Sequence, residues 1–296
     1  MRTFAAVVLA LTAAATYAVA AVVQQRVASR TDKGDSMRPR LLVHLARERT
    51  WVMAMLLEVV SYALQATALF FGPLTLVAPL AGLDLVFALP MIARSRQVSL
   101  SLPNWAGAGC VVGGVALFLG VSPPSAGITS PPFLSWVPLF TAVGGLLMIG
   151  MVAARRSIGL VRAGVLAAIG AVEFGVVAAL SKSFVSEIGR LHWGVFSEWQ
   201  PYALVAVGVL GTLLAQSAFQ AGSLAVSLPI IDTVEPISAV VIGATLFDES
   251  LASSPLLLSA QLLGAALAIV GIMVIDRSKL VRESPSGGQG TAAAAS

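Results

Sequence analysis

The sequence places five acidic residues inside long apolar stretches, where a charged group is costly. A carboxylate at the centre of a membrane-spanning helix costs on the order of 3 kcal/mol, so it normally faces a polar cavity, a partner or a proton. Lysine and arginine are missing from the middle of these stretches, and Lys182 falls at the end of one of them. We therefore expect the acids to be protonated or to bind a cation. They are Glu58, Asp84, Glu173, Asp232 and Glu235.

Polar residues accompany Glu58 on one face of a predicted helix. They follow it at spacings of three, four and seven residues, which places them on the same side of an otherwise apolar helix. A stripe of this kind is expected to face the interior of a helix bundle. The three residues are Ser61, Tyr62 and Gln65.

A second group of acids lies in a later stretch. Asp232 and Glu235 are three residues apart, so both can hardly be ionised in a low dielectric without a bound cation. Together with Glu58 they form a candidate ligand set for a divalent cation, bound directly or through water as suits Mg²⁺. The preceding apolar stretch supplies further polar lining with Thr212, Gln216 and Gln220.

Prolines occur at matching places in the two halves of the chain. Each proline removes a backbone donor and frees a carbonyl, so these positions are predicted to interrupt two helices, as is typical of a transport site. The prolines are Pro79 and Pro90 in the first half and Pro229 and Pro236 in the second. Two plainer interpretations stay open: the prolines bend helices for packing, and the acids are protonated hydrogen-bonding groups between helices.

Composition identifies the environment of these residues. Of the 296 residues, 57% are hydrophobic and 11% are charged, whereas a soluble chain carries about 25% charged residues. The lipid bilayer is therefore the main partner, and a soluble enzyme, a nucleic-acid-binding module and a disordered chain are excluded. One cysteine and two histidines provide neither an intrachain disulfide nor a Cys/His zinc site. The sequence shows no phosphate-binding loop or catalytic triad, so no enzymatic activity and no cofactor are expected.

Nine apolar runs are long enough to cross a bilayer, since about 20 helical residues span its hydrocarbon core. The runs lack the alternation of a barrel, so the predicted fold class is an all-α polytopic membrane protein with nine transmembrane helices. Very short connections around Gly72 and Gly222 predict tight antiparallel pairs of the helices that they join. The runs are Thr3–Val23, Trp51–Phe71, Leu74–Ala93, Trp105–Val121, Phe133–Ala153, Gly164–Leu180, Tyr202–Ala221, Val226–Phe247 and Leu256–Ile275.

The two halves of the chain resemble each other. Residues 6–29 match residues 163–186 at eight identical positions with a constant offset of 157. The expected architecture is four helices, one linking helix and four helices again. Its parts are a first unit at 1–121 with a basic loop at 26–50, the linking helix in 122–158, a second unit at 159–276 and a disordered tail at 277–296.

Glycines take part in the repeat and in a packing pattern. At the offset of 157, Gly107 matches Gly264 and Gly114 matches Gly271. Gly109 and Gly113 are four residues apart, which predicts a small-residue face for close helix packing.

Basic residues indicate how the chain is oriented. With nine spans, fifteen lysines and arginines fall in one set of loops and only three in the other. The positive-inside rule then places the amino terminus outside and the carboxyl terminus in the cytoplasm. The two four-helix units become antiparallel, which is typical of transporters that alternate access around a midplane site.

Residues 51–86 resemble the second and third helices of the NIPA magnesium transporters, a branch of the drug/metabolite transporter superfamily. The matching positions are Trp51, Glu58, Pro73, Leu76, Val77, Pro79 and Leu80, and the loop residues Gly34, Ser36, Met37 and Arg38 are similar too. The later helix with Glu235-Pro236 and Asp248-Glu249 looks more like the EamA-type exporters of the same superfamily.

Three functions follow from these observations as hypotheses. The resemblance implies a transporter of the inner (plasma) membrane that moves Mg²⁺ or another divalent cation through the acidic site. The alternatives are a proton-coupled exporter of a small metabolite and a membrane scaffold without transport. The sequence is compatible with a homodimer.

Overall fold

The computed structural model describes residues 2–28, 48–97, 99–121, 127–221, 224–252 and 254–276, and every regular element in these ranges is a helix. Most of the predicted basic loop (26–50), the predicted tail (277–296) and the side chains of Gln216 and Gln220 lie outside the described residues. The elements are α1 (Arg2–Ala28), α3 (Arg49–Phe71), α4 (Leu74–Ala81), α5 (Asp84–Arg96), α6 (Leu102–Gly120), α7 (Phe133–Arg156), α8 (Gly159–Leu191), the 3₁₀ helix η2 (His192–Ser197), α9 (Gln200–Ala221), α10 (Leu224–Leu246) and α11 (Pro255–Asp276).

Eight segments of the described chain are long and apolar enough to cross a membrane, so the protein is a polytopic helical membrane protein. They coincide with eight of the predicted runs, and α4 with α5 forms one of them. The remaining run, Tyr202–Ala221, coincides with α9, of which Gln200–Ala215 is a shorter apolar segment. The count of nine spans stays a prediction.

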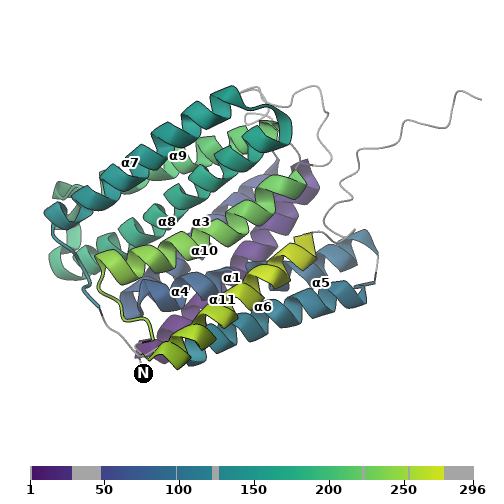
Figure 1. Ribbon diagram of the computed structural model, residues 1–296, viewed down its shortest axis with the longest axis horizontal. Coiled ribbons are helices and arrows are strands. Elements are labelled where there is room, and N and C mark those ends of the chain that lie inside the picture. The colour runs from purple at the N-terminus through teal and green to yellow at the C-terminus, as the bar shows by residue number, and fades with distance from the viewer. Residues whose placement is uncertain are drawn as a thin grey trace, which may run out of the picture.

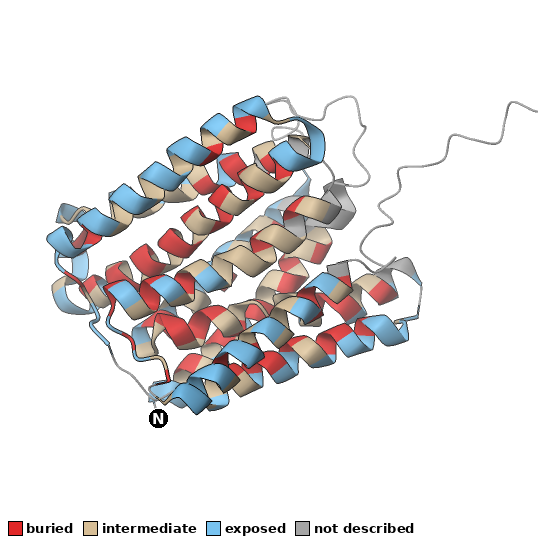
Figure 2. Cartoon of the chain, in the orientation of Figure 1, coloured by how far each residue is buried: buried red, intermediate tan, exposed pale blue. Residues whose placement is uncertain are grey.

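Helix α8 is the most buried span of the bundle. Buried residues follow it along most of its 33 residues, whereas α7 at the rim is largely exposed (Figure 2). The predicted run Gly164–Leu180 is therefore too short. Apolar residues continue at helical spacing with Val185 and Ile188, so the helix extends to Leu191 and encloses Lys182 instead of ending before it.

Four helix pairs make most of the contacts. α1 packs along α3, α6 along α11, and α8 along both α9 and α10 (Figure 1). The predicted tight pairs of α3 with α4–α5 and of α9 with α10 are wrong, because these helices make few contacts. A short connection brings only the ends of two helices together, whereas complementary faces decide which helices lie side by side. Between α1 and α3, for example, Ser61 Oγ donates a hydrogen bond to Ala13 O at 2.8 Å.

Helices α6 and α11 cross with their backbones in contact. A Cβ atom added at Gly114 would lie 2.4 Å from Ala268 N and 2.5 Å from Gly264 O. One added at Gly271 would lie 2.6 Å from Gly107 O. Close approach of this kind is possible only where a side chain is absent.

Gly109 and Gly113 do not form the predicted packing face. A Cβ atom at either position would meet nothing within 4 Å. The packing glycines of α6 are Gly107 and Gly114, which are two helical turns apart and therefore share a face that Gly109 and Gly113 do not share.

The predicted third span is broken between α4 and α5. Gly82 and Leu83 separate the two helices, with φ, ψ of −65°, 0° and −81°, −4°. Leu83 N donates to Leu80 O at 3.2 Å, which tightens the chain into a 3₁₀-like turn. The break thus lies between Pro79 and Pro90 rather than at either proline.

In the second half, the predicted interruption by Pro229 and Pro236 is wrong. Both prolines lie inside α10, which is a single helix. A proline removes only the hydrogen bond to the carbonyl four residues before it. In a membrane helix, neighbouring helices and hydroxyl groups can satisfy that carbonyl, so α10 continues through both prolines.

Candidate functional site

Five side chains from four helices gather into one acidic group. Tyr17 comes from α1, Glu58 and Tyr62 from α3, Asp84 from α5 and Glu235 from α10. The rings of Tyr17 and Tyr62 meet edge to face with their centroids 6.3 Å apart. Both tyrosines lie within electrostatic reach of all three carboxylates, and Glu235 lies within reach of Asp84. We call these five residues the acidic group.

The break between α4 and α5 positions Asp84 within the acidic group. Asp84 is the first residue of α5, and its Oδ1 accepts a hydrogen bond from Leu85 N at 2.7 Å. The amino-terminal end of a helix carries a partial positive charge, which favours an anion there. Gly82 faces α10, because a Cβ atom at this position would lie 3.8 Å from Pro236 Cγ. The break therefore lies against the turn of α10 that carries Glu235.

The other polar residues of the predicted α3 stripe have different surroundings. Ser61 is buried and its hydroxyl is used in the hydrogen bond to α1. Tyr62 is 51% exposed, and Gln65 is half-buried. Of this stripe, Ser61 therefore serves a contact between helices, whereas Tyr62 and Gln65 are partly exposed beside Glu58.

Two further predicted residues, Glu173 and Thr212, lie on helices that do not contribute to the acidic group. Glu173 is 3% exposed and lies where α8 meets Gly211 of α9. Asp232 is half-buried on α10, three residues before Glu235. Thr212 is exposed on α9 and donates to Gly208 O at 2.9 Å.

The described residues contain no group of three or more His, Cys, Asp or Glu side chains arranged to hold a metal ion. Glu58, Asp232 and Glu235 are thus not assembled as a direct coordination shell in this structure. The acidic group supplies carboxylates, two phenol hydroxyls and a helix end, which suits a hydrated cation or a proton better than a dehydrated metal.

A buried ion pair between Lys182 and Glu249 was not predicted from the sequence. Both residues are 2% exposed, and Lys182 Nζ contacts Glu249 Oε1. Lys182 Nζ also lies 4.2 Å from the centre of the Phe247 ring. The glutamate accepts hydrogen bonds from Leu74 N at 2.6 Å and from Thr75 N at 2.7 Å, so it also caps the first turn of α4.

Glycines make room for the carboxylate of Glu249. A Cβ atom at Gly243 would lie 2.7 Å from Glu249 Oε2. Gly127 adopts a φ of +55°, and a Cβ atom there would lie 2.5 Å from Phe247 O. The helical spacing of apolar residues after Lys182 was the signal that this lysine lies inside a helix. No sequence pattern near Glu249 identifies its role, because its partners are 67 and about 175 residues away along the chain.

No protein-family model and no solved structure matches the chain. A protein of Corynebacterium glutamicum, described as the uncharacterized protein Cgl0250/cg0304, is 32% identical to it over 253 residues. The similarity covers 82% of this chain and 85% of that protein. The chain therefore belongs to the same family as this corynebacterial protein.

Proposed function

We propose that the protein is a membrane transporter whose substrate or coupling ion binds at the acidic group. The observation that carries this proposal is the convergence of Glu58, Asp84 and Glu235 at a broken membrane helix. Each of these carboxylates is expensive inside a membrane. Three of them come from three different helices and lie beside the break between α4 and α5, which supports a site that binds and releases a charged solute.

The packing of the helices supports an inverted repeat of the drug/metabolite transporter type. Under the offset of 157, α1 corresponds to α8 and α6 to α11. The pair α1–α3 then corresponds to the pair α8–α9, and the two helices of each pair are in extensive contact. At the crossing of α6 and α11, Gly107 contacts Gly271 and Gly114 contacts Gly264. This exchange of equivalent residues is what a two-fold relation between the halves produces.

The first candidate substrate is a divalent cation such as Mg²⁺. Mg²⁺ keeps several of its water molecules and is usually bound by one or two carboxylates. Carboxylates that lie near one another without forming a closed coordination shell fit this requirement. In this proposal Glu58 and Glu235 compensate the charge of the hydrated ion, and Asp232 extends the acidic surface along α10.

The second candidate function is proton-coupled export of a small metabolite. It is favoured by the edge-to-face contact of Tyr17 and Tyr62 and by the 51% exposure of Tyr62, because these rings offer an apolar surface to an organic substrate. The carboxylates would then carry protons instead of binding a metal. We propose the plasma membrane as the location, with nine spans, the amino terminus outside and the carboxyl terminus in the cytoplasm.

Uptake by proteoliposomes tests the proposal. The purified protein should accelerate Mg²⁺ entry, read by a Mg²⁺-sensitive dye inside the vesicles, with and without an imposed pH gradient. Glu235→Gln should slow uptake about tenfold or more, because it removes a charge-assisted interaction of about 1.5–3 kcal/mol. Glu48→Gln is the control: Glu48 is exposed at the start of α3 and its side chain caps nothing, so uptake should be unchanged.

The outcomes separate the candidates. Cation transport is supported if Mg²⁺ uptake does not depend on the pH gradient and is lost in Glu235→Gln. Absence of Mg²⁺ uptake, together with loss of the pH gradient that Glu235→Gln prevents, supports proton coupling. If both fluxes persist in Glu235→Gln, the acidic group is not the transport site. If neither flux occurs in the wild type, the scaffold hypothesis replaces the proposal.

A further inference from the structure

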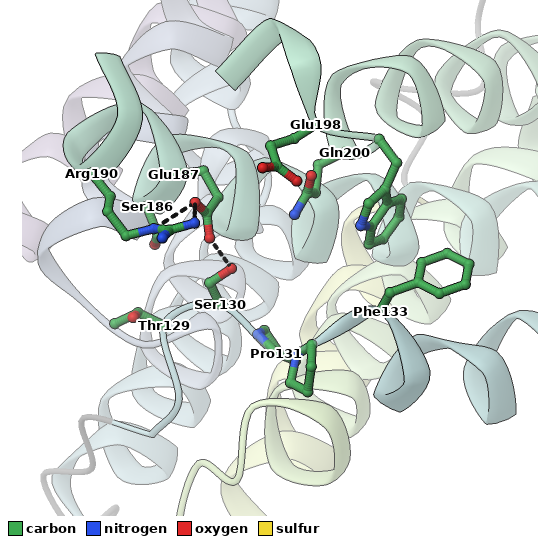
Figure 3. A pocket seen from close by; sticks show the side chains of 11 residues that line it. Thr129, Ser130, Pro131, Phe133, Ser186, Glu187, Arg190, Glu198 and Gln200 are labelled. Carbon is green, nitrogen blue, oxygen red and sulfur yellow. Dashed lines mark hydrogen bonds and ion pairs between the residues drawn. The ribbon is translucent and has the colours of Figure 1, made fainter. Parts of the chain in front are cut away.

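A pocket outside the acidic group lies where α8 ends and α7 and α9 begin. It has a volume of about 560 Å³ and is formed by the segment before α7, the last turns of α8 and the segment between η2 and α9 (Figure 3). This size is in the range of small-molecule sites, which are commonly about 300–1,000 Å³. The transport proposal does not use this pocket.

Gln200 lines the pocket, but its side-chain oxygen is enclosed by protein. The residue is 5% exposed, and its Oε1 has almost no accessible surface and no hydrogen-bond partner among the described residues. A ligand in the pocket cannot reach this atom, so the charges and the rings of the lining decide what binds.

The charged side chains that line the pocket determine which charge a ligand should carry. Arg190 Nε and Nη2 donate to Glu187 Oε2 at 2.9 Å and 2.7 Å, and Ser130 Oγ donates to Glu187 Oε1 at 2.5 Å. Arg190 and Glu187 thus compensate each other. Glu198 is half-buried and forms no ion pair within the described part of the chain, so its carboxylate leaves the lining with an excess negative charge. An anion is disfavoured and a cation is favoured.

Aromatic rings form the remaining wall. Phe133 and Trp199 both line the pocket and meet edge to face with their centroids 5.3 Å apart. Aromatic faces attract ammonium groups and cover the apolar part of a ligand. A bare metal ion would not need this wall.

We propose that this pocket binds a small organic cation with a primary ammonium group and an apolar body. The ammonium group donates to the Glu198 carboxylate, and the apolar body lies against Trp199 and Phe133. The pocket is a binding site in its own right, and its occupancy does not depend on the acidic group.

Calorimetric titration of the purified full-length protein with 2-phenylethylamine tests the proposal, with protein-free micelles as the blank. The amine should bind saturably. 3-Phenylpropionate has the same apolar body with a negative group, and 2-phenylethanol has a neutral one; both should bind about tenfold more weakly or not at all. Hexylamine replaces the aromatic body with an alkyl chain and should still bind.

One variant locates the binding. Glu198→Gln should weaken binding of 2-phenylethylamine about tenfold, while Glu48→Gln should bind as the wild type does. Glu235→Gln should also bind normally, which separates this pocket from the transport site. The proposal is overturned if neither amine binds saturably, if 3-phenylpropionate binds as tightly, or if folded Glu198→Gln binds the amine unchanged.

Discussion

Lys182→Met should lower the free energy of unfolding by about 3–5 kcal/mol, because it leaves the buried carboxylate of Glu249 without its cation. The effect should be visible as a large drop in the midpoint of thermal or denaturant unfolding in detergent. The lysine is 2% exposed and its partner sits at the amino-terminal end of α4, so water cannot easily take its place.

A double variant shows whether the lost stability comes from the unpaired charge. Lys182→Met with Glu249→Gln removes both charges and keeps an acceptor for the backbone of α4, so it should recover a large part of the loss. Arg155→Met changes an exposed basic residue at the end of α7 and should alter the unfolding free energy by less than about 0.5 kcal/mol. A Lys182→Met protein as stable as the wild type would mean that the pair is weak or solvated.

Gly114→Ala should destabilise the protein by about 1–3 kcal/mol or more, since overpacking forces helices apart. The new methyl group would lie 2.4 Å from Ala268 N, and backbone cannot move aside as a side chain can. Gly113→Ala is a control at the next residue of the same helix. Nothing lies within 4 Å of its added Cβ atom, so its unfolding midpoint should stay the same or rise slightly through the better helix propensity of alanine.

The comparison of these two variants tests the crossing itself. Equal effects of Gly113→Ala and Gly114→Ala would show that α6 and α11 do not meet through Gly114. A selective loss in Gly114→Ala, matched by Gly264→Ala on the facing helix, would support the close contact of the two backbones.

The helix boundaries were predictable because one physical quantity, the length of an apolar run, sets them. Eight predicted runs coincide with spanning segments of the structure. The largest error was at the end of α8, where a single lysine ended the predicted run although apolar residues continued at helical spacing. Helix pairing was not predictable from connection length, because side-chain complementarity decides it.

The acidic group was predictable in part. The free-energy cost of placing a carboxylate inside an apolar helix indicated Glu58, Asp84 and Glu235, which the structure brings together. Tyr17 was missed, because an aromatic residue in an apolar helix looks like lipid-facing or core packing until its neighbours are known. Glu173 has the same residue type as Glu58 but faces a different helix. It lacks the polar residues that follow Glu58 at helical spacing, and this was the sequence difference between the two acids.

Glu249 caps α4 but is synthesised much later than α4. Leu74 and Glu249 are 175 residues apart, so at about 5–20 residues per second roughly 10–35 s of synthesis separate them. During that time the first turn of α4 lacks its acceptor. Lys182, which is made 67 residues before Glu249, lacks its counter-ion for the last part of the interval. The amino-terminal helices therefore enter the bilayer in a provisional arrangement, and the protein reaches its final structure only after α10 has been translated.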